Sequence, residues 1–313
     1  MYRSQCAKCL SRFSQESLTI PAPLNIAILT ADPSNYSNRR MMEAGRAAGH
    51  NVYPLLSLEQ ILSVDDHEFE QSLSPRPDAV IPRIGVALTD YGHSLLMSLE
   101  DKNIPVMTSA YGLVHSRNKF LGGQVLKSAG IAVPKTVTFA DYGNIDKAIK
   151  LVGGYPFVLK RLKGTQGNAV FLINDVDKAH KKIGKYIRKR KAFLIQEYIK
   201  ESQGTDLRCF VVGGKVVGAM KRVAAEGNFR ANIHQGGKGL AATLSKAERD
   251  MAIEAAEVLD LQIAGVDILR SDNGPMVLEV NSSPGLQGIE KATGKDIAGE
   301  IIRYIEKMVH KSG

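Results

Sequence analysis

Cysteine is scarce in this sequence. Only Cys6, Cys9 and Cys209 occur among 313 residues. Three cysteines are too few for a disulfide framework and fit a reducing compartment. Cys6 and Cys9 form a Cys-x-x-Cys pair, but no second pair or His cluster follows at zinc-finger spacing. We therefore expect neither a structural zinc nor a redox role for this pair.

Long apolar runs are absent as well. No stretch approaches the roughly 18 residues that a membrane-spanning helix needs. We expect a soluble, cytoplasmic protein with no membrane partner. Motifs of several enzyme classes are also missing: the sequence contains no P-loop, Gly-x-Ser-x-Gly or His-Glu-x-x-His. No Gly-x-Gly-x-x-Gly follows the first expected strand, so nothing indicates a dinucleotide site in the N-terminal half.

Positive charge, by contrast, is in excess. The formal net charge is +9, and much of it lies in residues 181–191, which read KKIGKYIRKRK. One interpretation is a helix with an exposed basic face. The other is a docking surface for an acidic or RNA-containing partner. No aromatic residues are interleaved for base stacking, so direct nucleic-acid binding is not expected.

The first 24 residues differ from the rest. They are rich in Ser, and Glu16 is the single acid among several basic residues, which slightly resembles a transit peptide. We expect either a disordered extension or a start codon placed too early. We do not expect residues 1–24 to form part of the folded domains.

From residue 25 strand and helix patterns alternate. We predict strands at 25–30, 51–55, 78–83 and 105–107, and helices at 37–49, capped by Ser37, and 89–101. Such alternation predicts an α/β domain with a Rossmann-like parallel sheet and helices on both faces.

The remaining chain has an α+β pattern. We predict helices at 116–129, 176–190, 246–260 and 296–310, and strands at 134–139, 157–160, 169–173, 193–196, 205–212 and 216–223. The predicted organisation is an extension (1–24), an α/β domain (25–115), a central subdomain (116–190) and a C-terminal subdomain (191–313).

A hairpin near the C-terminus carries the strongest functional signal. Two apolar runs flank the turn Asp272-Asn273-Gly274 in residues 265–285. Alternation along the second strand places Glu279 and Asn281 on one face, where Asp267 of the first strand can join them. Oxygen ligands without Cys or His suit Mg²⁺ or Mn²⁺. The alternative is ordinary polar residues at strand ends, but acids inside apolar runs cost energy unless charge or metal compensates.

Other residues suit a nucleotide. Residues 163–168 form a loop with two glycines between two strands, and its backbone N–H groups can approach phosphates. Lys160 ends the preceding strand, and its ammonium either binds phosphate or reaches solvent. Glu197 closes another apolar strand, whose edge can pair with an adenine or simply carry an exposed acid.

Basic residues cluster on the next two strands. Asp206 and Arg208 share one strand face, and Lys221, Arg222 and then Arg230 follow. Together they can hold phosphates or carboxylates, although each alone is more often a surface charge.

In this order the motifs resemble the ATP-grasp superfamily, and specifically the RimK-type glutamate ligases, which attach glutamate to the C-terminus of a ribosomal protein. The resemblance covers residues 25–305. It rests on Lys160, GTQG at 164–167, QEYI at 196–199, Asp206 with Arg208, RAN at 230–232, Asp267, EVNSSPG at 279–285, IPRIG at 81–85 and AGVDILR at 264–270.

The resemblance implies an ATP-grasp fold behind a pre-ATP-grasp domain, and it implies roles for single residues. Asp267, Glu279 and Asn281 would bind one or two Mg²⁺ or Mn²⁺ ions. ATP would contact Lys119, Lys160, Gly164, Thr165, Gln166, Gly167, Glu197, Tyr198, Asp206, Arg230, Ala231 and Asn232. Arg222 would hold the transferred phosphoryl group or the developing oxyanion. In the family an Asp often precedes the lysine of the central helix, whereas Asn118 stands here.

The implied activity is an ATP-dependent, ADP-forming ligation of L-glutamate to a protein C-terminus through an acylphosphate. A related ligase acting on a small carboxylate is the alternative, and a non-catalytic nucleotide-binding regulator is a third possibility. Family members are often dimers or tetramers, so a homo-oligomer is expected.

Overall fold

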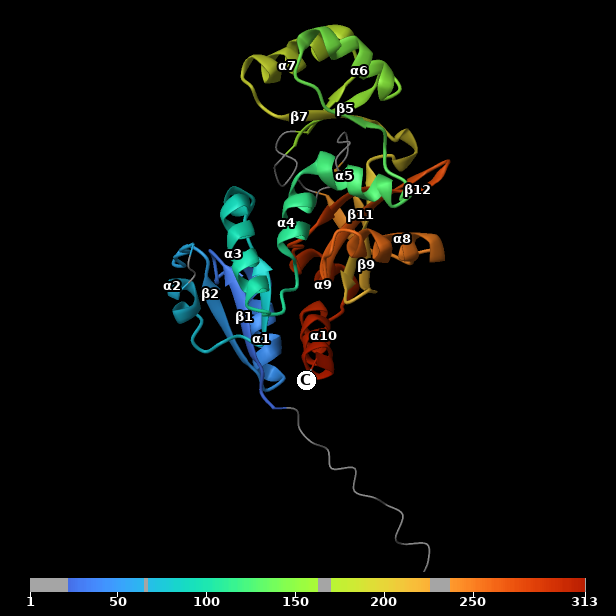
Figure 1. The fold of residues 1–313 in the computed structure, drawn as a ribbon. Coiled ribbons are helices and arrows are strands. Elements are labelled where there is room, and N and C mark those ends of the chain that lie inside the picture. The colour runs from blue at the N-terminus through green and yellow to red at the C-terminus, as the bar shows by residue number, and fades with distance from the viewer. Residues whose placement is uncertain (1–21, 65–66, 163–169, 226–236, 313) are drawn as a thin grey trace, which may run out of the picture.

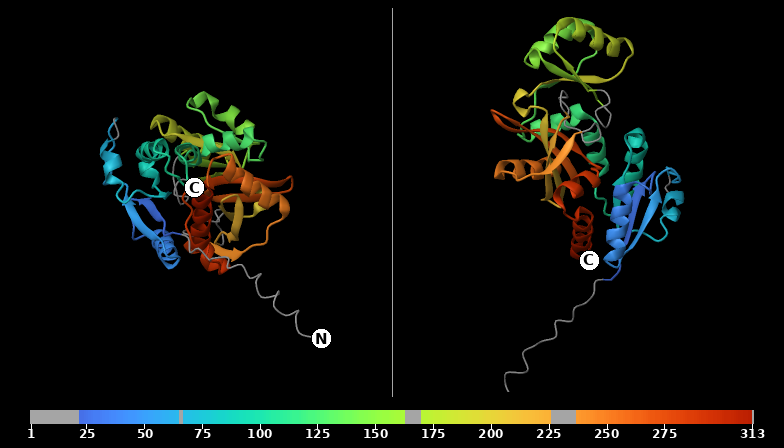
Figure 2. Two further views of the ribbon diagram at one scale, coloured as in Figure 1. Left: turned by 60° about the horizontal axis from the view of Figure 1, so that its bottom comes forward. Right: turned by 180° about the vertical axis from the view of Figure 1, so that it is seen from behind.

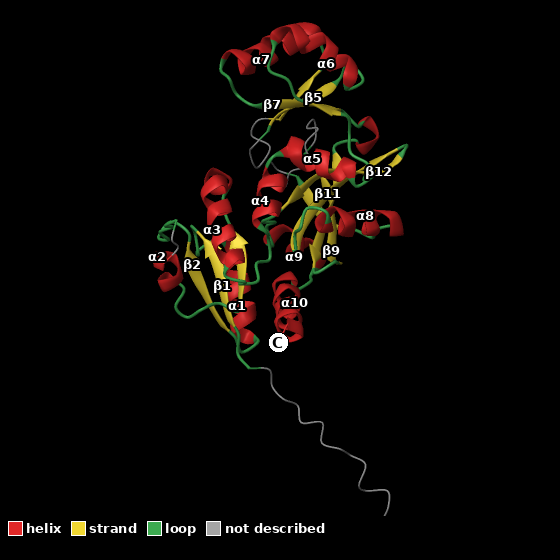
Figure 3. Cartoon of the chain, in the orientation of Figure 1, coloured by secondary structure: helices red, strands yellow, loops and turns green. Residues whose placement is uncertain are grey.

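The computed structural model describes residues 22–64, 67–162, 170–225 and 237–312. Three sheets lie within these ranges (Figure 1). Some helices cover outer faces of the sheets, whereas α1 (Tyr36–Ala47) and α10 (Ile297–Ser312) lie between the N-terminal and C-terminal sheets (Figure 3). Among the described helices, none combines the length and apolar composition needed to cross a bilayer.

The N-terminal sheet is parallel, with strand order β2-β1-β3. Its elements are β1 (Asn25–Thr30), α1 (Tyr36–Ala47), β2 (Asn51–Leu56), α2 (His67–Ser72), β3 (Ala79–Arg83) and α3 (Thr89–Asp101). Side chains of β1 alternate between two cores: Ile26 and Ile28 pack with α1, while Ala27 and Leu29 pack with α3. The predicted parallel sheet with helices on both faces is therefore confirmed.

The central sheet is antiparallel, with order β4-β7-β5-β6. It is preceded by α4 (Ala110–Arg117) and α5 (Lys119–Ser128), and its elements are β4 (Thr136–Val137), α6 (Ile145–Leu151), β5 (Phe157–Arg161), β6 (Val170–Ile173), α7 (Val176–Arg188) and β7 (Phe193–Glu197). Helices α6 and α7 cover its outer face (Figure 1). Strand β7 belongs to this sheet, although the predicted boundary at residue 190 assigns it to the C-terminal subdomain.

The C-terminal sheet has order β10-β9-β8-β11-β12 and is antiparallel throughout. Its elements are β8 (Thr205–Val212), β9 (Lys215–Val223), β10 (Lys238–Ala241), α8 (Lys246–Glu257), β11 (Ile263–Ser271), β12 (Gly274–Asn281), α9 (Gln287–Thr293) and α10 (Ile297–Ser312). Helix α8 packs on one face and α9 and α10 on the other.

Helix α10 packs against helix α1 of the N-terminal domain. Its buried residues Ile297, Ile301, Ile302 and Ile305 recur at the spacing of one helix face. They share one core with Met41 of α1 and with β8. Figure 2 shows α10 beside α1 from two further sides. This core fixes the N-terminal sheet against the C-terminal sheet, which carries the candidate site.

Several predicted elements differ from the observed ones. The strand predicted at 105–107 is reduced to one isolated bridge, in which Val106 pairs with Val80. The helix predicted at 116–129 is divided at Asn118, whose extended backbone separates α4 from α5. Asn35, not Ser37, caps α1, because the Ser37 hydroxyl accepts the backbone N–H of Leu286. Helices α2, α6 and α9 and strand β10 were not predicted, because each is too short to show a clear periodic pattern.

Candidate active site

The hairpin of β11 and β12 forms as predicted, and it places two acids opposite each other. Asp267 pairs with Glu279, and Gly265 pairs with Asn281. The register shifts after Asp267, because Ile268 pairs with Val277 and Leu278 is left as a bulge. Glu279 and Asn281, two residues apart, therefore point to the same face as Asp267.

Two arginines hold Asp267, one from the adjacent strand β8 and one from β9, the strand beyond it. Arg208 of β8, its register partner, donates from Nε to Oδ1 and from Nη2 to Oδ2, the latter at 2.8 Å. Arg222 of β9 lies with Nη2 2.7 Å from Asp267 Oδ2. Asp267 is 1% exposed, so both charges compensate a carboxylate that is removed from water.

Arg222 also binds Asp206, its register partner on β8. Its Nε and Nη2 donate to the two carboxylate oxygens at 2.6 and 2.8 Å. Burial raises the pKa of Asp206 to about 6, against the opposing effect of Arg222. Burial by itself lowers the pKa of Arg222, but the charges of Asp267 and Asp206 raise it above its usual range. Arg222 therefore stays charged beside Asp267.

Lys119, the first residue of α5, reaches the other acid. Its Nζ lies 2.5 Å from Glu279 Oε2. The Lys119 charge holds the pKa of Glu279 far below its usual range, although burial opposes this. Asn118 caps α5 by accepting the N–H groups of Phe120 and Leu121. Asn and Asp are equally good caps, so Asn118 fills the place where the family often has Asp.

Lys160 approaches from the central sheet. It is 8% exposed, and its Nζ donates to Gln196 Oε1 at 2.7 Å. Gln196 in turn donates to the Thr136 hydroxyl. Burial lowers the pKa of Lys160 to about 8, although the charge of Glu279 raises it. An anion beside Lys160 would offset the cost of burying its charge.

Glu197 and Tyr198 lie at the end of β7. The Glu197 carboxylate accepts the backbone N–H of Lys135 at 3.2 Å, and Glu197 N–H donates to Lys135 O. Strand β7 lies between β4 and β5. Strand β7 is therefore not an edge strand of this sheet, because it is paired on both sides.

A pocket lies beside Glu279, between α5, β12 and the strands β4 and β7. Its walls are mainly apolar or glycine, and Lys119, Thr136, Gln196 and Glu279 provide polar groups. The lining residues are Ser116, Lys119, Gly122, Gly123, Leu126, Val133, Thr136, Gln196, Leu259, Val277, Leu278, Glu279 and Val280. A flat, largely apolar group with a charged end fits such a lining.

Some predicted contacts fall outside the described residues. These are Gly164, Thr165, Gln166, Gly167, Arg230, Ala231 and Asn232. The structure brings together the other predicted residues Asp206, Arg222, Asp267, Glu279 and Asn281 with the two lysines. It adds roles for Arg208 and Gln196, which belong to the motifs of the resemblance but had been given no function. The alternation of Asp206 with Arg208 on one strand is a sequence signal for the first, whereas the contact of Gln196 with Lys160 has no local signal in the sequence.

The donor set fits a hard divalent cation. Asp267 and Glu279 are carboxylates, and the Asn281 amide donates from Nδ2 to Gly265 O at 3.2 Å, which leaves Oδ1 as an acceptor. In the described part of the chain, no three His, Cys, Asp or Glu side chains cluster as a metal site. Beside the two carboxylates, Asn281 Oδ1 is thus an available amide oxygen, and such a set of oxygen donors would suit Mg²⁺ or Mn²⁺.

Comparison with models of protein families shows to which family this chain belongs. A model described as the RimK-like ATP-grasp domain matches residues 116–305, and a model of the RimK PreATP-grasp domain matches residues 24–113. The chain belongs to the RimK-like ATP-grasp family. It is an ATP-dependent ligase, as its relatives and structural neighbours in this superfamily are.

Relatives of this RimK-like chain extend over nearly its whole length. A protein of Aeromonas salmonicida named probable alpha-L-glutamate ligase is 44% identical over 287 residues, which are 90% of this chain and 96% of the relative. One of Shewanella amazonensis, named probable alpha-L-glutamate ligase 1, is 43% identical over 292 residues, 92% and 97% of the two chains.

Solved structures agree with the ATP-grasp fold. A RimK domain protein of Sphaerobacter thermophilus superimposes with a TM-score of 0.69 at 24% identity, covering 90% of this chain and 98% of the other. The D-alanine–D-alanine ligase of Bacillus anthracis gives 0.64 at 17% identity, covering 93% and 100%. At these identities the likeness concerns the fold alone.

Proposed function

We propose that this ligase adds L-glutamate to the C-terminal carboxylate of a ribosomal protein, with ATP converted to ADP and phosphate. The names of relatives that are 43–44% identical over nearly the full chain support glutamate as the added amino acid. The resemblance of the sequence to RimK-type ligases supports a protein C-terminus as the acceptor.

The chemistry requires activation of the acceptor. A carboxylate does not react with an amine near neutral pH, because oxide or hydroxide is too poor a leaving group. The acceptor carboxylate therefore attacks the γ-phosphorus of ATP, which forms an acylphosphate and releases ADP. The neutral amine of glutamate then attacks the acyl carbon, and phosphate departs from the resulting tetrahedral intermediate as the nitrogen loses a proton.

The described residues supply the charges for this chemistry. We assign Lys160 and Lys119 to ATP phosphates, because both ammonium groups lie beside Glu279. Arg222, oriented by Asp206 and Asp267, stabilises the transferred phosphoryl group or the oxyanion that forms on the acyl carbon. The purine of ATP lies in the pocket between α5 and β12, whose apolar walls exclude water.

Asp267, Glu279 and Asn281 would hold Mg²⁺ or Mn²⁺, which supplies charge neutralisation for the phosphoryl oxygens when bound. The predicted ATP contacts of 164–167 and 230–232, closure of the 164–167 loop over ATP, a homo-oligomeric state and a cytoplasmic location remain parts of the proposal.

One observation carries the assignment. Two acids and an amide share one face of β11 and β12, and four cations from three other parts of the chain converge on these acids: Lys119, Lys160, Arg208 and Arg222. The four cations outnumber these acids, and the excess of positive charge is costly to bury alone and suits a polyphosphate with its metal.

The test is ADP release by the purified protein with Mg²⁺, glutamate and a panel of acceptors, followed by mass spectrometry of each acceptor. We expect ADP release to depend on a ribosomal protein, whose C-terminal peptide gains the mass of one glutamate residue per addition. ADP release that only a small carboxylate stimulates would reject the protein acceptor. Addition of a different amino acid would reject glutamate.

A further inference from the structure

Two arginines outside the charged cluster converge on the turn that follows β12. Arg83, the last residue of β3, donates from Nη1 to Pro284 O at 2.8 Å and from Nε to Asn38 Oδ1 at 3.2 Å. Arg117, the last residue of α4, donates from Nη2 to Ile84 O at 2.6 Å and to Ser283 Oγ at 3.2 Å. Three separate parts of the chain thus meet at this turn.

Neither guanidinium has an ionic partner among the described residues. Arg208, Arg222 and Arg270 each form an ion pair with a carboxylate, but the partners of Arg83 and Arg117 are neutral oxygens. Burial, together with the nearby charge of Arg117, lowers the pKa of Arg83 to about 10. Burial also lowers the pKa of Arg117. The fold therefore brings two positive charges together without neutralising them.

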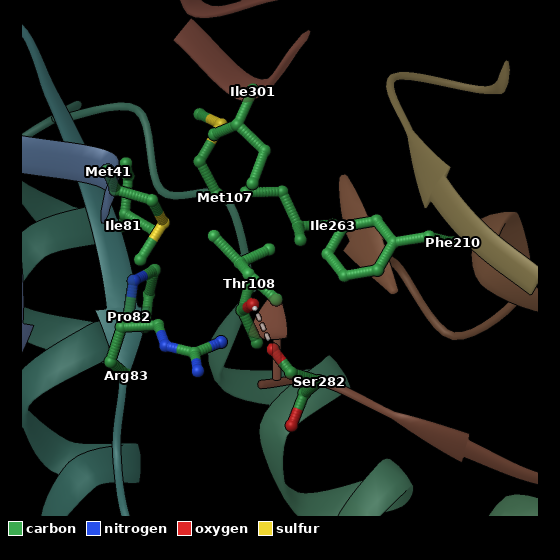
Figure 4. A pocket seen from close by; sticks show the side chains of 11 residues that line it. Met41, Ile81, Pro82, Arg83, Met107, Thr108, Phe210, Ile263, Ser282 and Ile301 are labelled. Carbon is green, nitrogen blue, oxygen red and sulfur yellow. Dashed lines mark hydrogen bonds between the residues drawn. The ribbon is translucent and has the colours of Figure 1, made fainter. Parts of the chain in front are cut away.

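Unsatisfied polar atoms lie at the same place. Arg117 Nε and Ser282 Oγ are buried and have no hydrogen-bond partner. Ser282 lines a small cavity between the N-terminal and C-terminal sheets, together with Arg83 and Thr108. Figure 4 shows the Arg83 guanidinium pointing from β3 toward Thr108 and Ser282. A buried donor without a partner is rare in a folded protein, and a ligand is one explanation for it.

This basic pair lies next to the proposed reaction centre. Arg117 is two residues before Lys119, and Ser283 is two residues after Asn281. Lys119 and Asn281 are joined through Glu279, which contacts both. Two short stretches of chain therefore connect the arginine pair with the proposed phosphoryl-transfer site.

We infer that Arg83 and Arg117 hold a carboxylate of the amino acid that supplies the amine, an inference that rests on the proposed function. Glutamate carries two carboxylates, and neither reacts, so both need lasting neutralisation. The acceptor carboxylate, in contrast, has to meet the γ-phosphate. Guanidinium groups match carboxylate geometry with paired hydrogen bonds, and two of them define where the amine end of glutamate points. Both residues are positioning and specificity residues.

The experiment compares Arg83→Met, Arg117→Met and Arg83→Lys with wild type by steady-state kinetics in which ATP, glutamate and acceptor are varied separately. We expect kcat/KM for glutamate to fall roughly 10- to 100-fold in the two Met variants, since a hydrogen bond to a charged group is lost. The KM values for ATP and acceptor should stay near those of wild type. Arg83→Lys keeps a charge and should recover part of the loss. Arg76→Met, an exposed arginine of the same part of the chain, is the matched control.

A second comparison identifies the group that is bound. Glutamate is compared with glutamine and with the α-amide of glutamate. Wild type should prefer glutamate over the amide that replaces the bound carboxylate, and the Met variants should lose this preference. A merely structural role would lower activity with all three compounds alike, and that result would overturn the inference. Circular dichroism and thermal unfolding establish that each variant is folded, and Arg83→Lys carries the test if a Met variant is not.

The remaining outcomes are distinct. An unchanged kcat/KM for glutamate, or a loss confined to the acceptor, would overturn the pocket assignment while the proposed function stands. A wild-type enzyme that uses another amino acid would reject glutamate instead. The variants are then compared with that amino acid and its α-amide, and loss of discrimination would still support the pocket.

Discussion

Lys119 Nζ and Glu279 Oε2 lie 2.5 Å apart, so the first residue of α5 is tied to β12. In the proposed function Lys119 binds a phosphate of ATP and Glu279 binds the metal. Glu279→Gln keeps the shape and removes the charge. We expect ADP formation to fall by roughly 100-fold or more, as for loss of one electrostatic stabiliser in an active site. Glu257→Gln on the surface of α8 is the control and should have wild-type activity.

Lys160 predicts a pH dependence. Its pKa is about 8, so the ammonium form is lost as the pH rises above 8. If only this form binds ATP phosphates, the KM for ATP should rise roughly tenfold per pH unit above 8. Lys160→Arg keeps its charge at these pH values and should flatten the profile. A wild-type KM for ATP that is constant from pH 7 to 10 would contradict the assignment.

The lowered pKa of Lys160 also makes the free energy of unfolding depend on pH. Lys160 has a lower pKa when folded than its ordinary 10.5. Between pH 8 and 10.5 the unfolded chain therefore binds more protons, and the contribution of this group to the free energy of unfolding rises with pH. Urea titrations across this range should show that the free energy of unfolding of wild type rises with pH relative to that of Lys160→Met.

Asp206 predicts a stability effect, because it is a buried partner of Arg222. Asp206→Asn leaves a buried guanidinium with one carboxylate fewer, and the free energy of unfolding should fall by about 3–5 kcal/mol. Asp250→Asn breaks the exposed pair with Lys246 and should cost less than about 1 kcal/mol. Urea unfolding near pH 7.5 checks both. Equal losses would show that the Asp206 pair is no more than a surface pair.

Asn118 connects local structure with the site. Asn118→Ala removes the side chain that caps α5, and the free energy of unfolding should fall by about 1 kcal/mol. Asn118→Asp should retain the cap and wild-type stability. Because Lys119 follows directly, the KM for ATP should rise only in the Ala variant. Thermal unfolding and ATP kinetics of the two variants measure both effects.

The basic residues of α7 and the segment after it test the class of acceptor. We consider exposed Lys181, Lys185, Arg188, Lys189 and Lys191 together. Their replacement by Gln should raise the KM for a ribosomal protein on the order of tenfold at low salt and leave the KM for ATP unchanged. Exposed lysines on α8, α9 and α10 provide the control with Gln at Lys246, Lys291 and Lys307. An effect of equal size in the control would point to net charge instead of a docking surface.

The fold was predictable from the sequence where periodicity was long. Strand β1 and helix α3 have the predicted bounds, and the hairpin of β11 and β12 forms around the predicted turn. The helix at 116–129 was predicted wrongly as continuous, because an Asn inside a helical pattern does not reveal whether it interrupts the helix. Asn118 does so here by taking an extended backbone and capping the second helix.

For the site, sequence alone determined which residue types lie on which face of a strand. The period of two placed Asp206 with Arg208 and Glu279 with Asn281. Only the tertiary structure decided which strands are neighbours, and hence that Arg222 binds Asp206 and Asp267 together. The convergence of Arg83 and Arg117 on residues 282–284 was equally outside the sequence, since the partners are about 166–201 positions apart. Pairing between distant segments depends on packing of the whole chain, which no local pattern encodes.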